Sequence, residues 1–145
     1  MRLLIHLPNK PLFFNQNGLT DYKFYCFGGE PRFLYVSENL SDHENSCMAF
    51  FDLKLNEMPF RRSDYKHMES SPLVPDKFDE MVDIARRISA GFDFLRVDLY
   101  YVGYEIYFSE CTFYPCDGYM KFEPEEYDEK VGNLLMITKG NYNNE

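Results

Sequence analysis

Four polar side chains stand at alternate positions on two neighbouring segments of the chain. Arg96 and Asp98 lie two residues apart, and so do Glu110 and Thr112. If both segments are strands, each pair points to one face, and pairing the strands can bring all four side chains together. An Asp and a Glu beside a hydroxyl and an arginine suit a hard divalent cation such as Mg²⁺. That ion takes few protein carboxylates and completes its shell with phosphate oxygens and water.

Two strands joined by a tight turn must position these residues. We expect the first strand over Phe94–Tyr101 and the second over Tyr104–Thr112. Val102 and Gly103 would form the turn, because Gly103 can supply the positive φ that such a turn needs.

The same pattern has a second interpretation. Charged residues at alternate strand positions usually face water, and Asp98 and Glu110 would then be independent surface charges. If the two carboxylates do meet with no cation between them, they should repel each other. One of them should then take up a proton more readily than a free side chain does.

A third polar pair, Asp21 and Lys23, lies on an earlier segment. Residues 21–27 predict a strand whose even-numbered residues are apolar, so Asp21 and Lys23 share the other face. A turn at Gly28-Gly29 would lead into a partner strand over Pro31–Ser37. The alternative here is a half-exposed strand whose charges are solvated.

One amphipathic helix is predicted over Asp76–Ser89, with Asp76 as its N-cap. Its apolar stripe recurs at helical spacing and consists of Phe78, Met81, Val82, Ala85 and Ile88. A further strand is predicted over Ser46–Leu53 and a second helix over Glu125–Leu135. Together these elements predict an α+β fold, an antiparallel β-sheet of about five strands with one main helix packed on it.

Composition narrows the class of partner. The chain has 145 residues, and its formal charge of −9 argues against nucleic acid or an anionic membrane as the main partner. No apolar run is long enough to span a membrane, so we expect a cytoplasmic protein. The four cysteines form no C-x-x-C pair and are expected to be free thiols.

The motif R-V-D at residues 96–98, followed by a hairpin and then E-x-T at residues 110–112, resembles the metal-binding hairpin of ATP-grasp enzymes. Their usual form is D, a hairpin, then E-x-N. The wider sequence is similar to one branch, the TupA-like ATP-grasp proteins of cell-surface polysaccharide biosynthesis. Four blocks carry this match: DYKFYCFGGEPRF from Asp21, FFDLKLNEMPF from Phe50, FLRVDLYYVGYEIYFSECTFYP from Phe94 and GYMKFEPEEYD from Gly118.

The resemblance implies roles for the hairpin residues. Asp98 and Glu110 would be the metal carboxylates, and Thr112, in the place of the usual Asn, would be a neutral oxygen ligand. Arg96 would be a catalytic contact to the phosphate or acyl phosphate. The implied cofactors are ATP and Mg²⁺.

The resemblance also assigns the earlier strand, where D-Y-K is similar to the D-x-R or D-x-K strand of ATP-grasp ligases. Asp21 would lie near the ribose and help to bind the cofactor. Lys23 would lie near the phosphates or the carboxylate of the acceptor, in a cofactor-binding and catalytic role. The fold implied is the C-terminal subdomain of an ATP-grasp domain over residues 21–137. Residues 1–20 would be a diverged or truncated N-terminal segment, and residues 138–145 a frayed tail.

The function implied is ATP- and Mg-dependent carboxylate–amine ligation in the synthesis of cell-surface polysaccharide or cell-wall polymer, with unidentified carboxylate and amine substrates. No segment here matches the ATP-grasp subdomain whose lysine and Gly-rich loop cover the phosphates, so we expect a partial enzyme that needs a missing N-terminal subdomain or a partner chain. Two alternatives stay open. One is a non-catalytic ATP-grasp-like binding module accessory to glycosyltransferase machinery, and the other is a remnant with no ligand.

Overall fold

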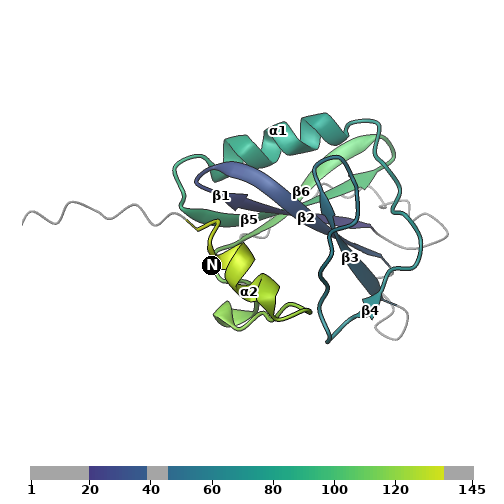
Figure 1. Ribbon diagram of the computed structural model, residues 1–145. Coiled ribbons are helices and arrows are strands. Elements are labelled where there is room, and N and C mark those ends of the chain that lie inside the picture. The colour runs from purple at the N-terminus through teal and green to yellow at the C-terminus, as the bar shows by residue number, and fades with distance from the viewer. Residues whose placement is uncertain (1–19, 39–45, 136–145) are drawn as a thin grey trace, which may run out of the picture.

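The structure, a computed structural model, describes residues 20–38 and 46–135 (Figure 1). The six strands are β1 (Asp21–Phe27), β2 (Glu30–Glu38), β3 (Cys47–Asp52), β4 (Lys66–His67), β5 (Phe94–Val102) and β6 (Glu105–Thr112). The helices are α1 (Phe78–Ser89), the short 3₁₀ helix η1 (Pro115–Gly118) and α2 (Glu126–Gly132). The predicted N-terminal segment, residues 1–20, lies outside the described residues except for residue 20, and the predicted tail, residues 138–145, lies wholly outside them.

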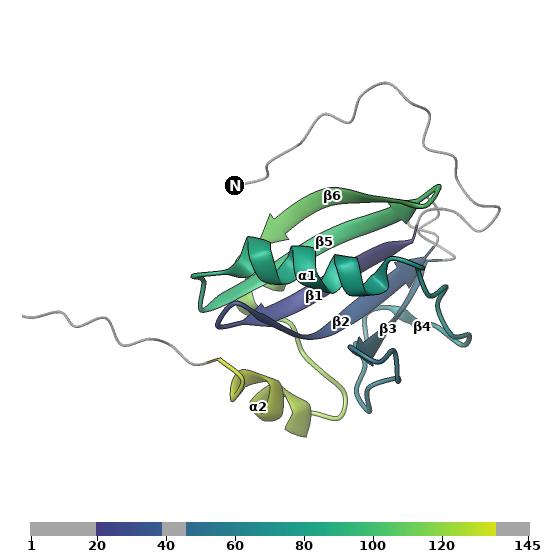
Figure 2. The same cartoon turned by 90° about the horizontal axis from the view of Figure 1, so that it is seen from above.

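The strands form one sheet in the order β4-β3-β2-β1-β5-β6. Every neighbouring pair is antiparallel except β3 and β4, which are parallel. Figure 2 shows this order with α1 lying across the sheet. The predicted α+β class and the packed helix are therefore confirmed, and the two-residue β4 brings the strands to six where about five were expected.

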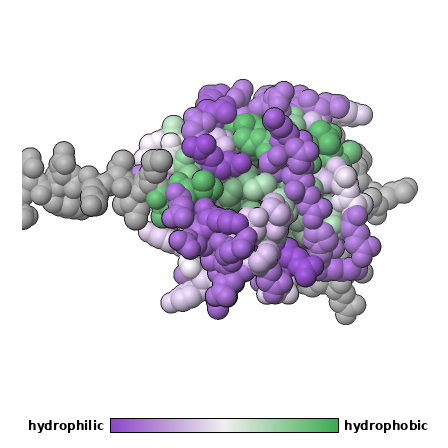
Figure 3. Space-filling view, viewed as in Figure 1, coloured by the Kyte–Doolittle hydropathy of each residue, from purple (hydrophilic) through white to green (hydrophobic). Residues whose placement is uncertain are grey.

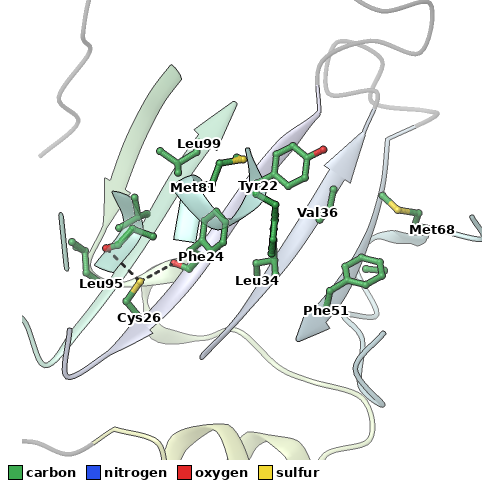
Figure 4. Packing of buried hydrophobic residues seen from close by; sticks show 14 residues of the cluster. Tyr22, Phe24, Cys26, Leu34, Val36, Phe51, Met68, Met81, Leu95 and Leu99 are labelled. Atoms are coloured by element: carbon green, nitrogen blue, oxygen red, sulfur yellow. Dashed lines mark hydrogen bonds between the residues drawn. The ribbon is translucent and has the colours of Figure 1, made fainter. Parts of the chain in front are cut away.

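Helix α1 covers one face of the sheet because its apolar stripe meets the even-numbered residues of β1. Phe78, Met81 and Ala85 are buried against Phe24 and Leu99, among others (Figure 4). A stripe at helical spacing that faces an apolar strand face removes both surfaces from water, which is the main favourable term in folding.

The buried thiol of Cys26 belongs to the same core. Its Sγ lies 3.7 Å from the carbonyl oxygen of Phe24 and 4.0 Å from that of Ala85 (Figure 4). Burial raises the pKa of Cys26 to about 11. Cys26 is therefore an apolar packing residue with an inert thiol, and all four cysteines are free as expected.

The opposite face carries a second, aromatic core that the sequence did not predict. Its buried residues are Tyr25, Phe27, Phe33, Tyr35, Met48, Phe50, Phe60 and Phe122. Tyr127 and Val131 of α2 pack against this cluster, and Figure 1 accordingly shows α1 and α2 on opposite sides of the sheet. Figure 3 shows that hydrophilic residues cover most of one side of the molecule, with hydrophobic ones visible between them.

The boundaries of the central hairpin differ by one residue from those expected. The turn residues are Gly103 and Tyr104, with φ of 58° and 68°, because Val102 still pairs with Glu105. Positive φ at both central residues is what a two-residue type I′ turn requires. Between the turn and the candidate site the register shifts: Leu99 faces Phe108 and Asp98 faces Glu110, so Ser109 is the extra residue of a β-bulge.

Both helices are shorter than predicted. Helix α1 begins at Phe78, and its N-cap is Lys77, which makes no side-chain cap bond, so Asp76 is not the N-cap. Helix α2 ends at Gly132 and not at Leu135. At the other end of α1, Gly91 follows the C-cap Ala90 with φ of 86°, which suits glycine.

Candidate functional site

A row of polar side chains crosses three neighbouring strands on the face opposite α1. Lys23 on β1 is the Cα partner of Asp98 on β5, and Asp98 is the partner of Glu110 on β6. Partners in an antiparallel pair point to the same face. The three polar pairs found in the sequence therefore form one cluster, although Lys23 and Asp98 are 75 residues apart.

Asp98 is the centre of this cluster. It is 0% exposed, and its Oδ2 accepts a hydrogen bond of 2.6 Å from Lys23 Nζ. Arg96 holds it in a two-point contact, with Nε 2.8 Å from Oδ1 and Nη2 2.7 Å from Oδ2. A carboxylate with this burial and these partners is not a solvated surface charge, so the alternative interpretation of Asp98 is wrong.

Arg96 also bridges the two carboxylates of the hairpin. Its Nη2 lies 3.0 Å from Glu110 Oε1 as well as 2.7 Å from Asp98 Oδ2. The expected repulsion between Asp98 and Glu110 is therefore wrong for this arrangement, because a guanidinium already lies between them. The spacing of the residues did not predict this bridge, because it depends on the conformation of the Arg96 side chain.

Thr112 lies at the edge of the cluster. It is the Cα partner of Arg96, and its Oγ1 is 3.5 Å from Glu110 Oε1, a long contact. Glu110 is more open than Arg96 and Asp98, with 32% of its side chain exposed. The four hairpin residues thus converge as the spacing predicted.

Asp21 joins the cluster through an ion pair with Lys23. It is 2% exposed, and its Oδ1 is buried without a hydrogen-bond partner. Burial raises the pKa of Asp21 to about 6, Lys23 opposes this shift, and the nearby Asp98 adds to it. A buried carboxylate oxygen without a hydrogen-bond partner costs free energy. Oδ1 of Asp21 can therefore still accept a hydrogen bond or bind a cation.

Both basic residues remain charged. Burial alone would lower the pKa of Lys23, but Asp21 and Asp98 more than offset this effect and raise it. Burial likewise works against the charge of Arg96, and its hydrogen bonds to Asp98 raise its pKa well above the usual range. The cluster therefore contains two side chains, Lys23 and Arg96, that stay positively charged at neutral pH.

The charges do not balance. Asp21, Asp98 and Glu110 are three carboxylates, while Lys23 and Arg96 are two cations, so the ionised cluster carries one surplus negative charge. Hard carboxylate oxygens and an orphaned buried oxygen fit a divalent cation. Among residues 20–38 and 46–135, no group of three or more His, Cys, Asp or Glu side chains is arranged to hold a metal ion, and Arg96 contacts both Asp98 and Glu110.

Sequence reasoning missed two residues beside the cluster. Tyr35 on β2 is the Cα partner of Lys23, and Ser37 is the partner of Asp21. Ser37 is buried and its Oγ has no partner. The predicted turn at Gly28-Gly29 would not have located them, since strict pairing from that turn places Leu34 and Val36 opposite Lys23 and Asp21. The β-bulge between Tyr25 and Cys26 shifts the register by one residue and brings Tyr35 and Ser37 there instead.

A cavity of about 510 Å³ lies elsewhere in the molecule. Its lining includes Glu57, Phe60, Arg61, His67 and Glu123, and none of the six candidate residues. The charged cluster therefore does not line this cavity.

The sequence comparisons identify the family. The family described as TupA-like ATPgrasp matches residues 2–136, and the chain belongs to this family. Neither the search of curated proteins nor the search of solved structures found a match. No helix among the described residues is long and apolar enough to cross a membrane.

Proposed function

We propose that this chain carries the metal and phosphate half of an ATP- and Mg²⁺-dependent carboxylate–amine ligase. It would act in the cytoplasm, in the synthesis of cell-surface polysaccharide or cell-wall polymer. One observation carries the proposal: Asp98 and Glu110 face each other on paired strands, with Lys23 and Arg96 on the same face. Family membership supports a role related to ATP-grasp chemistry.

The charge of the cluster supports this assignment. A γ-phosphoryl group that is being transferred spreads negative charge over its oxygens, and a site must neutralise that charge. Asp98 and Glu110 would hold Mg²⁺, which when bound would supply positive charge to offset the surplus negative charge of the cluster and of the phosphates. Thr112 would complete the oxygen donors of the protein.

The cations have separate tasks in this proposal. Arg96 would leave Glu110 and contact the phosphate or the acyl phosphate, while Lys23 would keep its hold on Asp98 and face the phosphates. Asp21, with its orphaned Oδ1, would accept a hydrogen bond from a hydroxyl of the nucleotide. A second subdomain or a partner chain would cover the nucleotide and bring the carboxylate and amine substrates.

Thermal melts with and without Mg²⁺ test the metal assignment. We expect Mg²⁺ to raise the melting temperature by linkage, and the double variant Asp98→Asn with Glu110→Gln to abolish that shift. Calorimetry should show only weak ATP binding by the isolated chain, with Kd on the order of millimolar. Equal melting temperatures with Mg²⁺ and with chelator, in both proteins, would refute the metal site.

A second candidate is a non-catalytic binding module. The observation that favours it is that both oxygens of Asp98 already accept hydrogen bonds from Arg96 and Lys23, which leaves this carboxylate closed. Such a module would bind nucleotide or anion without Mg²⁺. Calorimetry with ATP in the presence of a chelator separates the two, because the ligase site should lose binding and the module should keep it.

A further inference from the structure

The ring of Tyr35 lies against both cations of the cluster. Lys23 Nζ is 5.8 Å from the ring centroid, and the guanidinium carbon of Arg96 is also 5.8 Å from it. Both distances fall within the range of cation–π attraction. The strand register explains these contacts, because Lys23 on β1 faces Asp98 on β5 and Tyr35 on β2.

The positive charges of Lys23 and Arg96 lie close together, so their repulsion must be offset. Lys23 and Arg96 both donate to Asp98 Oδ2, at 2.6 and 2.7 Å, so their positive charges repel across one oxygen atom. The negative face of an aromatic ring offsets such repulsion without a formal charge. A carboxylate in the place of Tyr35 would instead bind the cations and keep them from a phosphate.

Packing fixes the ring. Tyr35 is 7% exposed, and its ring lies 5.6 Å from that of Phe50 at 77° and 6.0 Å from that of Tyr25. Because these partners belong to the aromatic core, the ring is part of a rigid layer that ends at the charged cluster. Its orientation does not depend on the cations.

We infer that Tyr35 is a positioning residue that holds Lys23 and Arg96 side by side, so that both can meet the phosphates of a nucleotide. The inference rests on the proposed function for the ligand alone, because the contacts of the ring exist without it. It predicts that the electron density of the ring, and not its hydroxyl group, matters to the cluster.

The test replaces Tyr35 in the full chain by Phe and by phenylalanines with two and three ring fluorines. These residues keep the shape of the ring while each fluorine weakens its negative face. Tyr35→Phe should bind Mg-ATP within twofold of the natural protein, and the affinity should fall stepwise by about three- to tenfold across the fluorinated series. The same residues at Phe33, which lies in the aromatic core and has no described cation contact, should change nothing.

An NMR titration of the Lys23 side chain without nucleotide gives a second readout. The pKa of Lys23 should fall stepwise across the fluorinated series at position 35 and stay constant across the series at position 33. A constant Lys23 titration in both series would overturn the inference. If the natural protein binds no Mg-ATP, the proposed function fails, and this titration still decides the role of Tyr35.

Discussion

Lys23 and Asp98 face each other on β1 and β5, with Nζ 2.6 Å from Oδ2. This contact joins the first hairpin of the chain to the last one, because β1 and β5 are neighbours at the centre of the sheet. The three pairs of polar residues seen in the sequence are therefore one electrostatic unit. Its members stabilise or destabilise one another.

Removing the ammonium group should destabilise the fold. Lys23→Gln leaves Asp98 with Arg96 alone and leaves Asp21 without its cation, so we expect a loss of about 3–5 kcal/mol in the free energy of unfolding. Denaturant unfolding measures it, with the exposed Lys121→Gln as the matched control. Adding Asp21→Asn to Lys23→Gln should recover part of the loss. A Lys23→Gln variant as stable as the control would show that the cluster contributes nothing to folding.

Removing the bridging guanidinium should change the response to Mg²⁺. In Arg96→Gln the carboxylates of Asp98 and Glu110 lose the guanidinium between them, and only Lys23 remains on Asp98. The variant should therefore melt below the natural protein in chelator and gain more from Mg²⁺ than the natural protein does. The exposed Arg87→Gln is the control. A smaller Mg²⁺ shift in Arg96→Gln than in the natural protein would contradict competition between Arg96 and the ion.

Stability should depend on pH through Asp21. Its pKa is raised from 3.8 in the unfolded chain to about 6 in the folded one, so the folded state holds this proton more tightly. As pH rises through that window the unfolded state releases the proton first, and stability falls by up to about 1.4 kcal/mol per pH unit. The difference between the natural protein and Asp21→Asn, measured by urea unfolding from pH 4 to pH 7, isolates this slope. A difference that is constant with pH would exclude a raised pKa at Asp21.

The two ends of the helix stripe should differ. Met81 is 0% exposed, whereas Ile88 is only partly buried against the same core. We expect Met81→Ala to cost about 2–5 kcal/mol and Ile88→Ala clearly less, because less surface is lost from the core. Urea melts of both, with the exposed Glu80→Ala as a control, give the comparison. Equal costs for Met81→Ala and Ile88→Ala would refute the difference in burial.

The hairpin turn offers a stabilising change. Tyr104 has φ of 68° and is one of the exposed aromatic residues. Tyr104→Gly should raise the free energy of unfolding by about 0.5–1 kcal/mol, because glycine adopts a left-handed conformation without strain. Gly103→Ala at the preceding position, where φ is 58°, should lower it. Thermal melts that move in the opposite directions would mean that the turn differs from the one described.

The sequence predicted the parts of the fold whose signals are local. Alternation over residues 21–27 and the helical stripe from Phe78 to Ile88 each reflect one face of one element. A short turn fixes the pairing of the strand residues next to it, but the turn at Gly103 and Tyr104 alone would pair Asp98 with Ser109. The bulge at Ser109, which no local pattern predicted, brings Asp98 and Glu110 opposite each other.

The remaining features depend on contacts between distant segments. Phe60 and Phe122 complete the aromatic core from stretches with no periodicity, so no pattern marked them as buried. The sequence of β1 did carry one indication of the second core, because its residues 24–27 are all apolar or aromatic. A continuous apolar run is typical of a strand that is covered on both faces. The bridge from Arg96 to Glu110 depends on side-chain conformation, which spacing does not determine.

The bulge at Ser109 has a consequence for engineering. Because one unpaired residue separates the hairpin tip from the charged cluster, the parts of β6 before and after Ser109 pair with β5 in different registers. A peptide tag or fluorescent reporter inserted between Gly103 and Tyr104 would lengthen a surface loop on the far side of that break. Asp98 would still face Glu110, so the tip offers a place to attach a probe that reports on the cluster without taking part in it.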